Sequence, residues 1–358
     1  MSVVLIGPLC GPQLMAALDL QGDAVVLRGE LRGGKRAGID RDDWPRLVEG
    51  DARLQGMKVE ANAALQRYAS VMGLHPVLHE GATVMGVSFK GEGPAWQVDD
   101  ARDALAAEIA RQILAAPGGI AASDGAARLP MTGVWAASRL RAQAMPPSGG
   151  DVVARRTRDS VTILDRHQPF LGFFGVEEQR LTYPLHAGGV SRPARREAFL
   201  MGDAVVLLPW DPVRDRVLVV EQFRFAAFLR GDPQPWLLEP IAGRVDAGED
   251  VEAAILREAR EEAALEIRRL IPCFQAYPSP GAVCEFIYHF IGIVDLPDDV
   301  AGIHGLDGEA EDIRGHLLDR AALSRMVDQG QLTDAPLIAL SLWLDSRAAR
   351  LRKEPEQA

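Results

Sequence analysis

Three glutamates in the C-terminal half of the chain have a spacing that suits divalent-metal chemistry. In the segment GRVDAGEDVEAAILREAREEAAL (243–265), Glu258 precedes Glu261 by three residues and Glu262 by four. On a helix, this spacing places all three carboxylates on one face, where their charges repel. Carboxylate oxygens suit hard cations such as Mg²⁺ or Mn²⁺, which bridge phosphate oxygens and activate water. Taken alone, the charges also fit a solvated acidic helix face, since glutamate is a good helix former.

The residues around these glutamates extend the run into a longer pattern. The segment follows G-x5-E-x7-R-E-U-x-E-E-x-G-U, where U is aliphatic, and so resembles the box of Nudix hydrolases. The matching residues are Gly243, Glu249, Arg257, Glu258, Glu261, Glu262 and Leu265. Two positions depart from the pattern: the small Ala259 follows the Arg-Glu pair, and Ala264 replaces the last glycine. If residue 264 needs a positive φ, alanine there costs about 1 kcal/mol.

The resemblance to Nudix hydrolases implies a set of metal ligands and a cofactor. Glu258 and Glu262 would be the main ligands, and Glu261 would assist through the metal or a water. The carbonyl of Ala242, in the turn just before the box, would supply a further oxygen. The implied cofactor is Mg²⁺, with Mn²⁺ able to replace it.

Three further residues of the box would support the ligands without binding metal. The resemblance implies an ion pair between Arg257 and Glu249 that holds the loop after Gly243 against the helix. An ordinary surface salt bridge is the alternative for this pair.

The sequence around the box resembles the ADP-ribose pyrophosphatases among Nudix enzymes, over residues 160–345. Four stretches show the resemblance: VVEQFRFAAF (219–228), PWLLEPIAGRVDAGE (235–249), AYPSPGAVCE (276–285) and GIHGLDGEAEDIRGHLL (302–318). It implies that Arg224 and Glu239 belong to the substrate-binding site, with Arg224 on a phosphate or ribose. Pro280, fifteen residues beyond Leu265, is the mark that separates ADP-ribose enzymes from many other Nudix hydrolases.

Hydrolysis of a diphosphate also needs a base that can reach the attacking water. In the family, a glutamate on an acidic loop outside the box has this role, and Glu309 occupies that position. Glu285, after the Ser-Pro-Gly turn, is the second candidate, and an exposed loop acid is the alternative for Glu309. Glu261 and Glu262 would contribute to catalysis through the metal. The products would be AMP and ribose 5-phosphate.

Two groups of residues before the box could contact the ends of the substrate. Arg196 or Arg195 resembles a family position that grips the terminal ribose or phosphate, often across a dimer interface. A surface arginine pair is the alternative. Phe170, Phe173 or Phe174 could stack on adenine, but packing in the core is the expectation that we prefer.

Composition excludes several classes of partner. The chain has 358 residues and a net charge of −11, which argues against nucleic acid and anionic membranes because both need a basic face. No run of 18 apolar residues occurs, so no membrane span is expected. The cysteines Cys10, Cys273 and Cys284 fit no zinc motif and are expected to be buried thiols of a cytoplasmic protein. The family resemblance implies a homodimer that acts on a small nucleotide sugar.

The elements that must position these residues divide into two parts. From residue 152, strand-like runs alternate with helices, which predicts a Nudix domain over 152–352, an α-β-α sandwich with a mixed sheet. Residues 117–151, rich in Ala, Gly, Pro and Ser, predict a helix and a linker. Short strands and a helix at 99–116 make up residues 1–116. The predicted class is therefore α+β, with a smaller α/β-barrel-like domain at the N-terminus.

The N-terminal part resembles γ-glutamylcyclotransferase-like domains. The similarity begins at VVLIGPLCGPQLM (3–15) and continues over 42–77. Ile6-Gly7-Pro8-Leu9 stands where the family has a tyrosine-containing turn, and LQRYASVMG (65–73) contains no carboxylate to act as the base. We therefore expect a degenerate domain without catalytic activity. Its combination with a Nudix box resembles two-part proteins associated with tellurite resistance.

Two other functions stay open from the sequence. One is hydrolysis of another nucleoside diphosphate derivative, such as a GDP-sugar or NADH, and Pro280 and the acidic loop favour ADP-ribose over these. The other is a non-catalytic sensor that binds ADP-ribose. Loss of carboxylates from the box would favour a sensor, and this box keeps every one of them.

Overall fold

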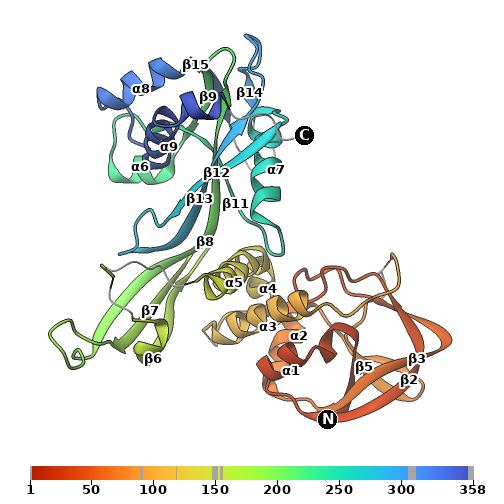
Figure 1. Cartoon of the computed structure of the whole chain (residues 1–358). Helices are drawn as coiled ribbons and strands as arrows, with labels where there is room; N and C mark the ends of the chain where they lie inside the picture. The colour runs from red at the N-terminus through yellow and green to blue at the C-terminus, as the bar shows by residue number, and fades with distance from the viewer. Residues whose placement is uncertain are drawn as a thin grey trace. The chain divides into compact units, whose positions relative to one another are not determined.

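The computed structural model describes residues 2–88, 92–117, 119–146, 152–153, 156–304 and 312–353 (Figure 1). Contacts between residues divide the chain into two compact units. We call Met1–Gly202, Asp246–Gly248 and Gly281–Cys284 the N-terminal unit, and Asp203–Val245, Glu249–Pro280 and Glu285–Ala358 the C-terminal unit. The domain boundaries predicted at residues 116 and 151 stay predictions.

A curled sheet forms the start of the N-terminal unit, with its strands ordered β2-β3-β1-β5-β4. Its strands are β1 (Ser2–Ile6), β2 (Gly22–Arg32), β3 (Arg46–Glu60), β4 (Val77–His79) and β5 (Ala82–Met85). β1 is antiparallel to β3 and parallel to β5, so the sheet is mixed. The Arg28 carbonyl on β2 lies 2.7 Å from His79 Nε2, and its N–H donates to Glu80 at 3.0 Å. The edge strands β2 and β4 therefore approach each other, which gives the barrel-like form that the sequence predicts.

Helices cover one face of this sheet. They are the 3₁₀ turn η1 (Gly7–Cys10), α1 (Pro12–Ala17), α2 (Ala63–Met72), α3 (Asp100–Ala115), α4 (Ala122–Ala127) and α5 (Leu129–Ala144). α3 begins at Asp99, whose side chain accepts a hydrogen bond from Arg102 N at 2.9 Å. Its apolar side, including Leu105 and Ile109, packs with Leu14 in the main core of the unit. α4 and α5 lie within residues 117–151, where the sequence predicts a helix and a linker.

An antiparallel meander completes the N-terminal unit. After η2 (Arg158–Ser160), β6 (Thr162–Leu171) pairs with β7 (Gly175–Thr182), which pairs with the first half of β8 (Ala194–Asp211). Phe170 and Phe173 at the β6–β7 turn are 58% and 59% exposed. The expectation that these two rings pack in the core is therefore wrong, because more than half of the surface of each residue faces solvent.

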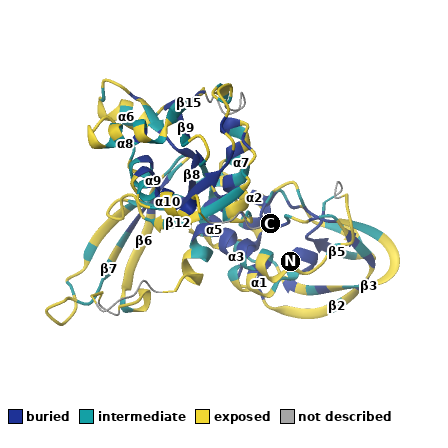
Figure 2. Cartoon of the chain, turned by 45° about the horizontal axis from the view of Figure 1, so that its top comes forward, coloured by how far each residue is buried: buried dark blue, intermediate teal, exposed yellow. Residues whose placement is uncertain are grey.

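The second half of β8 runs through the centre of the C-terminal unit, where its residues are buried (Figure 2). The strand order is β12-β13-β8-β9-β15-β14, and β10 and β11 pair with β9 and β8. These strands are β9 (Arg216–Phe223), β10 (Trp236–Glu239), β11 (Ile241–Arg244), β12 (Arg269–Ala276), β13 (Val283–Ile293), β14 (Ile303–His304) and β15 (Ile313–Asp319). β9 is antiparallel to β8, β10 and β15.

Side chains alternate along β8, so each face of the sheet has its own core. Val205 and Leu207 pack with α7 (Val251–Ala263) on one face. Val206 and Leu208 pack with the helices of the other face: α8 (Arg320–Asp328), α9 (Ala335–Asp345) and α10 (Ala348–Leu351). This arrangement confirms the predicted α+β class with a C-terminal α-β-α sandwich. The chain leaves the helix after Asp345 and re-enters it at Ala348, so α9 and α10 are separate helices.

α6 (Phe225–Arg230) follows β9 and ends at Gly231, which has a φ of 89°. In the described ranges, no helix is both long enough and apolar enough to cross a bilayer.

Candidate active site

The helix α7 holds the carboxylates of the box, and its ends are well defined. Asp250 caps its first turn by accepting hydrogen bonds from Glu252 N at 2.9 Å and Ala253 N at 3.4 Å. Ala259 is fully buried against the sheet, so a small residue fits this departure from the box pattern. Ala264 ends the helix with a φ of 51°, in the left-handed region that favours glycine. The strain expected for the second departure is therefore present.

Glu262 lies against the strand that precedes the box. Its side chain is buried, and its Oε2 accepts a hydrogen bond from Ala242 N at 3.0 Å. The N–H and C=O of one strand residue point to the same edge of the strand. The carbonyl of Ala242 therefore faces the same side as Glu262, where the sequence places it as a ligand.

Gly243 leaves room for Glu258. A Cβ at residue 243 would lie 1.8 Å from Glu258 Oε1 and 2.0 Å from its Cδ, so any side chain there would displace the carboxyl group. This close approach explains why the pattern needs glycine at this position. Together, Gly243 and Ala242 bring a carboxylate and a backbone carbonyl to one edge of β11.

Arg257 connects the loop to the helix. Its Nε and Nη2 donate to the two oxygens of Glu249, each at 3.0 Å, which forms the ion pair that the resemblance implies. Its Nη1 donates to Glu258 at 2.7 Å and to Glu261 at 3.0 Å. The hydrogen bonds with Glu249 raise the pKa of Arg257 above its ordinary value, against the opposing effect of burial. Arg257 therefore stays charged and orients three carboxylates.

The carboxylates of Glu258, Glu261 and Glu262 do not converge on one metal position in this structure. In the part of the chain that the structure describes, no group of three His, Cys, Asp or Glu side chains is arranged to hold a metal ion. Glu258 and Glu261 turn toward Arg257, and Glu262 turns toward the Ala242 amide. Their donor chemistry still fits a hard divalent cation, because every candidate ligand is a carboxylate or carbonyl oxygen. The room beside Gly243 also fits a carboxylate held for binding.

Arg224 and Glu239 form a second polar group near these carboxylates. Arg224 follows β9, and its Nε lies 2.8 Å from both oxygens of Glu239 at the end of β10. Burial would lower the pKa of Arg224, but the contact with Glu239 and the charge of Glu262 raise it overall. The Arg224 side chain is 41% exposed and that of Glu239 only 7%, so a buried acid holds a guanidinium group that solvent can reach.

Arg244 and Asp334 also belong to this group, and the sequence did not single them out. Burial raises the pKa of Glu285, and the charges of Arg244 and Arg224 partly oppose this rise. Burial also raises the pKa of Asp334 to about 6, while its hydrogen bond from Leu337 N opposes the rise and Glu239 adds to it. Arg244 directly follows the box glycine, and Asp334 precedes Ala-Pro as a helix cap, so both had a local signal.

The remaining predicted residues lie on other elements or outside the described residues. Pro280 is in an exposed turn between β12 and β13. Arg196 is exposed on the part of β8 that belongs to the N-terminal unit, and it donates to the Arg195 carbonyl at 2.8 Å. Arg195 forms an ion pair with Glu178. Glu309 lies outside the described residues.

Comparison with known proteins identifies the family of the part of the chain that holds this site. The NUDIX domain model matches residues 201–340. The ADP-ribose pyrophosphatase of Escherichia coli K12 is 39% identical over 197 residues, which are 55% of this chain and 93% of that protein. The ADP-ribose pyrophosphatase of Haemophilus influenzae is 34% identical over 199 residues, 55% of this chain and 91% of that protein.

Two more distant similarities complete the comparison. The GDP-mannose pyrophosphatase of Citrobacter koseri is 30% identical over 152 residues, 42% of this chain and 78% of that protein. A crystal structure of an ADP compounds hydrolase is 18% identical, with a TM-score of 0.43, and covers 55% of this chain and 99% of its own. That structural likeness is too low to support an argument. Because the chain covers 93% of a relative that is 39% identical to it, and has the full set of box carboxylates, it belongs to the Nudix family.

Proposed function

We propose that this protein is a metal-dependent pyrophosphatase that hydrolyses ADP-ribose to AMP and ribose 5-phosphate. The main support is the position of Glu258 and Glu262 against β11, beside Gly243 and the Ala242 carbonyl. The two relatives of highest identity described above are named ADP-ribose pyrophosphatases, which favours this substrate.

Glu258, Glu262, Glu261 and the carbonyl of Ala242 would hold the divalent metal, which we propose is Mg²⁺, with Mn²⁺ able to replace it. When bound, the metal would neutralise charge on the diphosphate and make a water more acidic. Arg257 prepares this site, because its contacts hold Glu258 and Glu261 on the same side of α7.

Arg224 would orient the substrate. Its bonds to Glu239 use Nε and Nη2, and in the described part of the chain its Nη1 has no hydrogen-bond partner. The Nη1 group can therefore donate to a phosphate or ribose oxygen. We also propose that Pro280 and Arg196 contact the substrate, as the family resemblance implies.

The base that takes the proton of the attacking water is proposed to be Glu309, with Glu285 as the second candidate. Burial raises the pKa of Glu285, and a carboxylate with a raised pKa is a stronger base. Glu309→Gln and Glu285→Gln distinguish the two candidates. Replacement of the true base lowers kcat and removes the acidic limb of the pH profile of kcat. The other replacement should leave that limb in place.

Hydrolysis of a GDP-sugar is the second candidate, because a GDP-mannose pyrophosphatase is 30% identical over 152 residues. The deciding experiment measures kcat/KM for ADP-ribose, GDP-mannose and NADH with Mg²⁺ under identical conditions. The proposal expects ADP-ribose to be preferred by at least about tenfold. A preference for GDP-mannose would favour the second candidate, and tight binding of ADP-ribose without turnover would favour a sensor.

We further propose a cytoplasmic homodimer, with a non-catalytic N-terminal domain over residues 1–116, a helix and linker over 117–151, and a Nudix domain over 152–352. The three cysteines are free thiols, as is usual in a reducing compartment. Burial raises the pKa of Cys10 and Cys273 to about 12, so both thiols are unreactive. Light scattering of the purified protein measures the oligomeric state, and a monomer would contradict the dimer.

A further inference from the structure

The segment between Gly243 and Glu249, which we call the box loop, begins and ends in the C-terminal unit but packs in the N-terminal unit. Its middle residues, Asp246–Gly248, belong to the N-terminal unit by their contacts. Val245 is fully buried in the core beside α7. Ala247, two residues later, is 6% exposed and lies in the main core of the N-terminal unit. Residues far from α7 in the sequence therefore fix the path of the box loop.

Ala247 meets the helix α5 at a glycine. A Cβ at Gly133 would lie 2.7 Å from the Ala247 Cβ, whereas ordinary contact begins at 3.4 Å. Glycine is the least favourable residue for a helix interior after proline, so helix formation does not explain its presence here. Leu129, Ala136 and Ala137 share this face of α5 by helical spacing, and they lie in the same core as Ala247. The close approach of the box loop therefore accounts for the glycine.

The next residue of the box loop packs on the same unit. Gly248 has a φ of 78°, and its Cβ position lies 3.6 Å from Ile39 Cδ1 and 3.8 Å from Leu105 Cδ2. Both of these side chains are buried. The box loop is therefore held at two successive residues, of which only Ala247 carries a side chain against α5.

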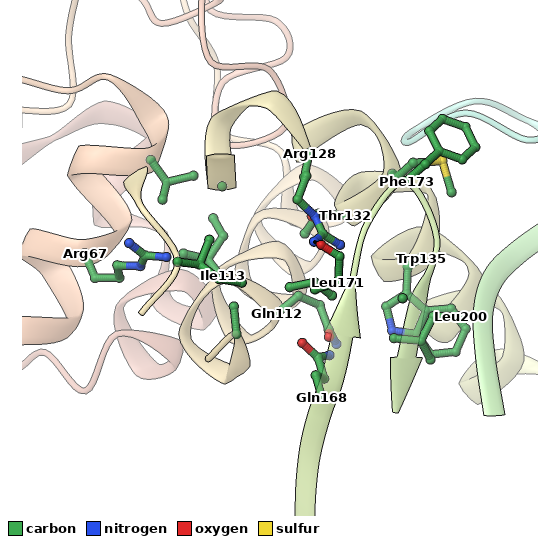
Figure 3. A pocket seen from close by; sticks show the side chains of 16 residues that line it. Arg67, Gln112, Ile113, Arg128, Thr132, Trp135, Gln168, Leu171, Phe173 and Leu200 are labelled. Carbon is green, nitrogen blue, oxygen red and sulfur yellow. Dashed lines mark hydrogen bonds between the residues drawn. The ribbon is translucent and has the colours of Figure 1, made fainter. Parts of the chain in front are cut away.

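The helix α5 is also held on the side away from Gly133. Arg128 and Trp135 lie roughly opposite Gly133 on the helix, and they line one pocket together with Leu171 on β6 (Figure 3). Arg128 Nη1 donates to the Leu171 carbonyl at 2.5 Å. The box loop has no helix or strand at residues 245–250. A group added between α5 and the box loop would therefore displace the loop more than the helix.

Both ends of the box loop are connected to the metal carboxylates through one guanidinium group. Arg257 Nη2 donates to Glu249 at 3.0 Å and to the Arg244 carbonyl at 3.2 Å. The Nη1 of the same group donates to Glu258 and Glu261. A displaced box loop would therefore move Arg257, and with it the two carboxylates that Arg257 orients.

We propose that Gly133 is a positioning residue for hydrolysis, which acts through Ala247 and the box loop on Arg257 and the metal carboxylates. This gives α5, within residues 117–151, a part in hydrolysis beyond that of a linker. The inference rests on the metal site of the proposed function, because Glu258 and Glu261 act only if they bind the metal.

Binding of Mn²⁺ to the full chain, measured from the paramagnetic resonance signal of the free ion, tests this proposal without substrate. Gly133→Ala adds one methyl group, which must displace the box loop by roughly 0.7 Å to reach ordinary contact. We expect Mn²⁺ binding to weaken about tenfold. In the AMP assay with ADP-ribose, kcat should fall by a similar factor and KM should change less, because Arg224 is not part of the box loop.

The variants of Ala247 test the contact from the other side. Ala247→Gly alone removes the methyl group that packs on α5, so the box loop is less well held and Mn²⁺ binding should weaken by about threefold or more. In the double variant with Gly133→Ala, the methyl group is moved from the loop to the helix, and the contact is restored. The double variant should therefore bind Mn²⁺ within about threefold of the wild type.

Gly125→Ala is the matched control for a methyl group added to a helix of the N-terminal unit. Gly125 lies on α4, and its Cβ would meet Val71 Cγ2 at 3.0 Å rather than the box loop. This variant should bind Mn²⁺ as the wild type does. Urea unfolding checks that each variant is folded.

Wild-type Mn²⁺ affinity in folded Gly133→Ala would overturn the proposal, and so would equal weakening in Gly125→Ala. If Gly133→Ala does not fold, Ala247→Gly decides, and unchanged Mn²⁺ affinity in that variant overturns the proposal. The proposed function fails in a different way. A wild type that binds Mn²⁺ but releases no AMP refutes the hydrolase, while the comparison of Mn²⁺ affinities still tests the role of Gly133. A wild type that binds no Mn²⁺ overturns both.

Discussion

Replacement of Gly243 by alanine should remove activity through one displaced carboxyl group. The new Cβ would lie 1.8 Å from Glu258 Oε1, whereas ordinary contact begins at 3.4 Å, so the carboxyl must move by roughly 1.5 Å. Gly243 does not have a positive φ, so alanine adds no backbone strain. A misplacement of about 1 Å can lower the rate about 100-fold, and we expect a loss of this size in kcat/KM.

The stability of this variant should change much less than its activity. Movement of Glu258 breaks its ion pair with Arg257. The Glu258 side chain is 13% exposed and the Arg257 side chain 31%, and such a pair contributes about 1 kcal/mol to stability. Release of AMP from ADP-ribose measures the activity, and urea unfolding measures the stability. The apparent affinity for Mg²⁺, obtained from the same AMP assay, should fall by about 10- to 100-fold.

Gly50→Ala is the control for the glycine substitution itself. Gly50 on β3 has open space around its Cβ position and no positive φ, so alanine there should change neither activity nor stability. If Gly243→Ala stays folded and retains activity within about threefold of the wild type, the position of Glu258 against β11 has no role in catalysis.

Three further predictions concern the surroundings of the box. Ala264→Gly should stabilise the protein by about 0.5–1 kcal/mol in urea unfolding. Glycine removes the backbone strain of alanine at a φ of 51°, and this gain exceeds the entropy cost of the more flexible unfolded chain. An unchanged urea midpoint would contradict this. Glu239→Gln leaves Arg224 without its acid, so KM for ADP-ribose should rise about tenfold and kcat should change less; a fall in kcat alone would contradict a binding role. The pKa of Asp334, raised to about 6 from 3.8, means that ionisation is less favourable in the folded state. The free energy of unfolding should therefore fall as pH rises from about 4 to 6. Asp334→Asn keeps the helix cap, so it should remove this fall and be about 1–3 kcal/mol more stable than the wild type at pH 7. If the free energy of unfolding of both proteins depends equally on pH, this prediction is refuted.

The sequence predicted the box well because its residues are close along the chain. Glu258, Glu261 and Glu262 repeat at helical spacing, so their common face follows from the geometry of one helix. Gly243 and Glu249 stand at fixed distances before that helix, and a pattern of this length rarely arises by chance. The family and the sandwich fold followed from the same local information.

Contacts between distant segments could not be predicted in the same way. Arg257 turns toward Glu258 and Glu261, which helix spacing permits but does not require. Asp334 reaches the neighbourhood of Arg224 and Glu239 only through the packing of α9 beside β10. These approaches depend on tertiary structure, which residue spacing does not encode.

Exposure was also harder to predict than the elements themselves. Phe170 and Phe173 are large apolar residues, and their types alone favour a core position. They lie at the end of a hairpin and are 58% and 59% exposed.

The most direct test of the account compares AMP release from ADP-ribose and Mg²⁺ by the wild type and Glu262→Gln. Glu252→Gln is the matched control, because Glu252 is an exposed glutamate in the first turn of the same helix. We predict AMP formation by the wild type and by Glu252→Gln, and its loss in Glu262→Gln. Equal AMP release by all three proteins would contradict a metal site on α7, and none from any of them would contradict the proposed hydrolase.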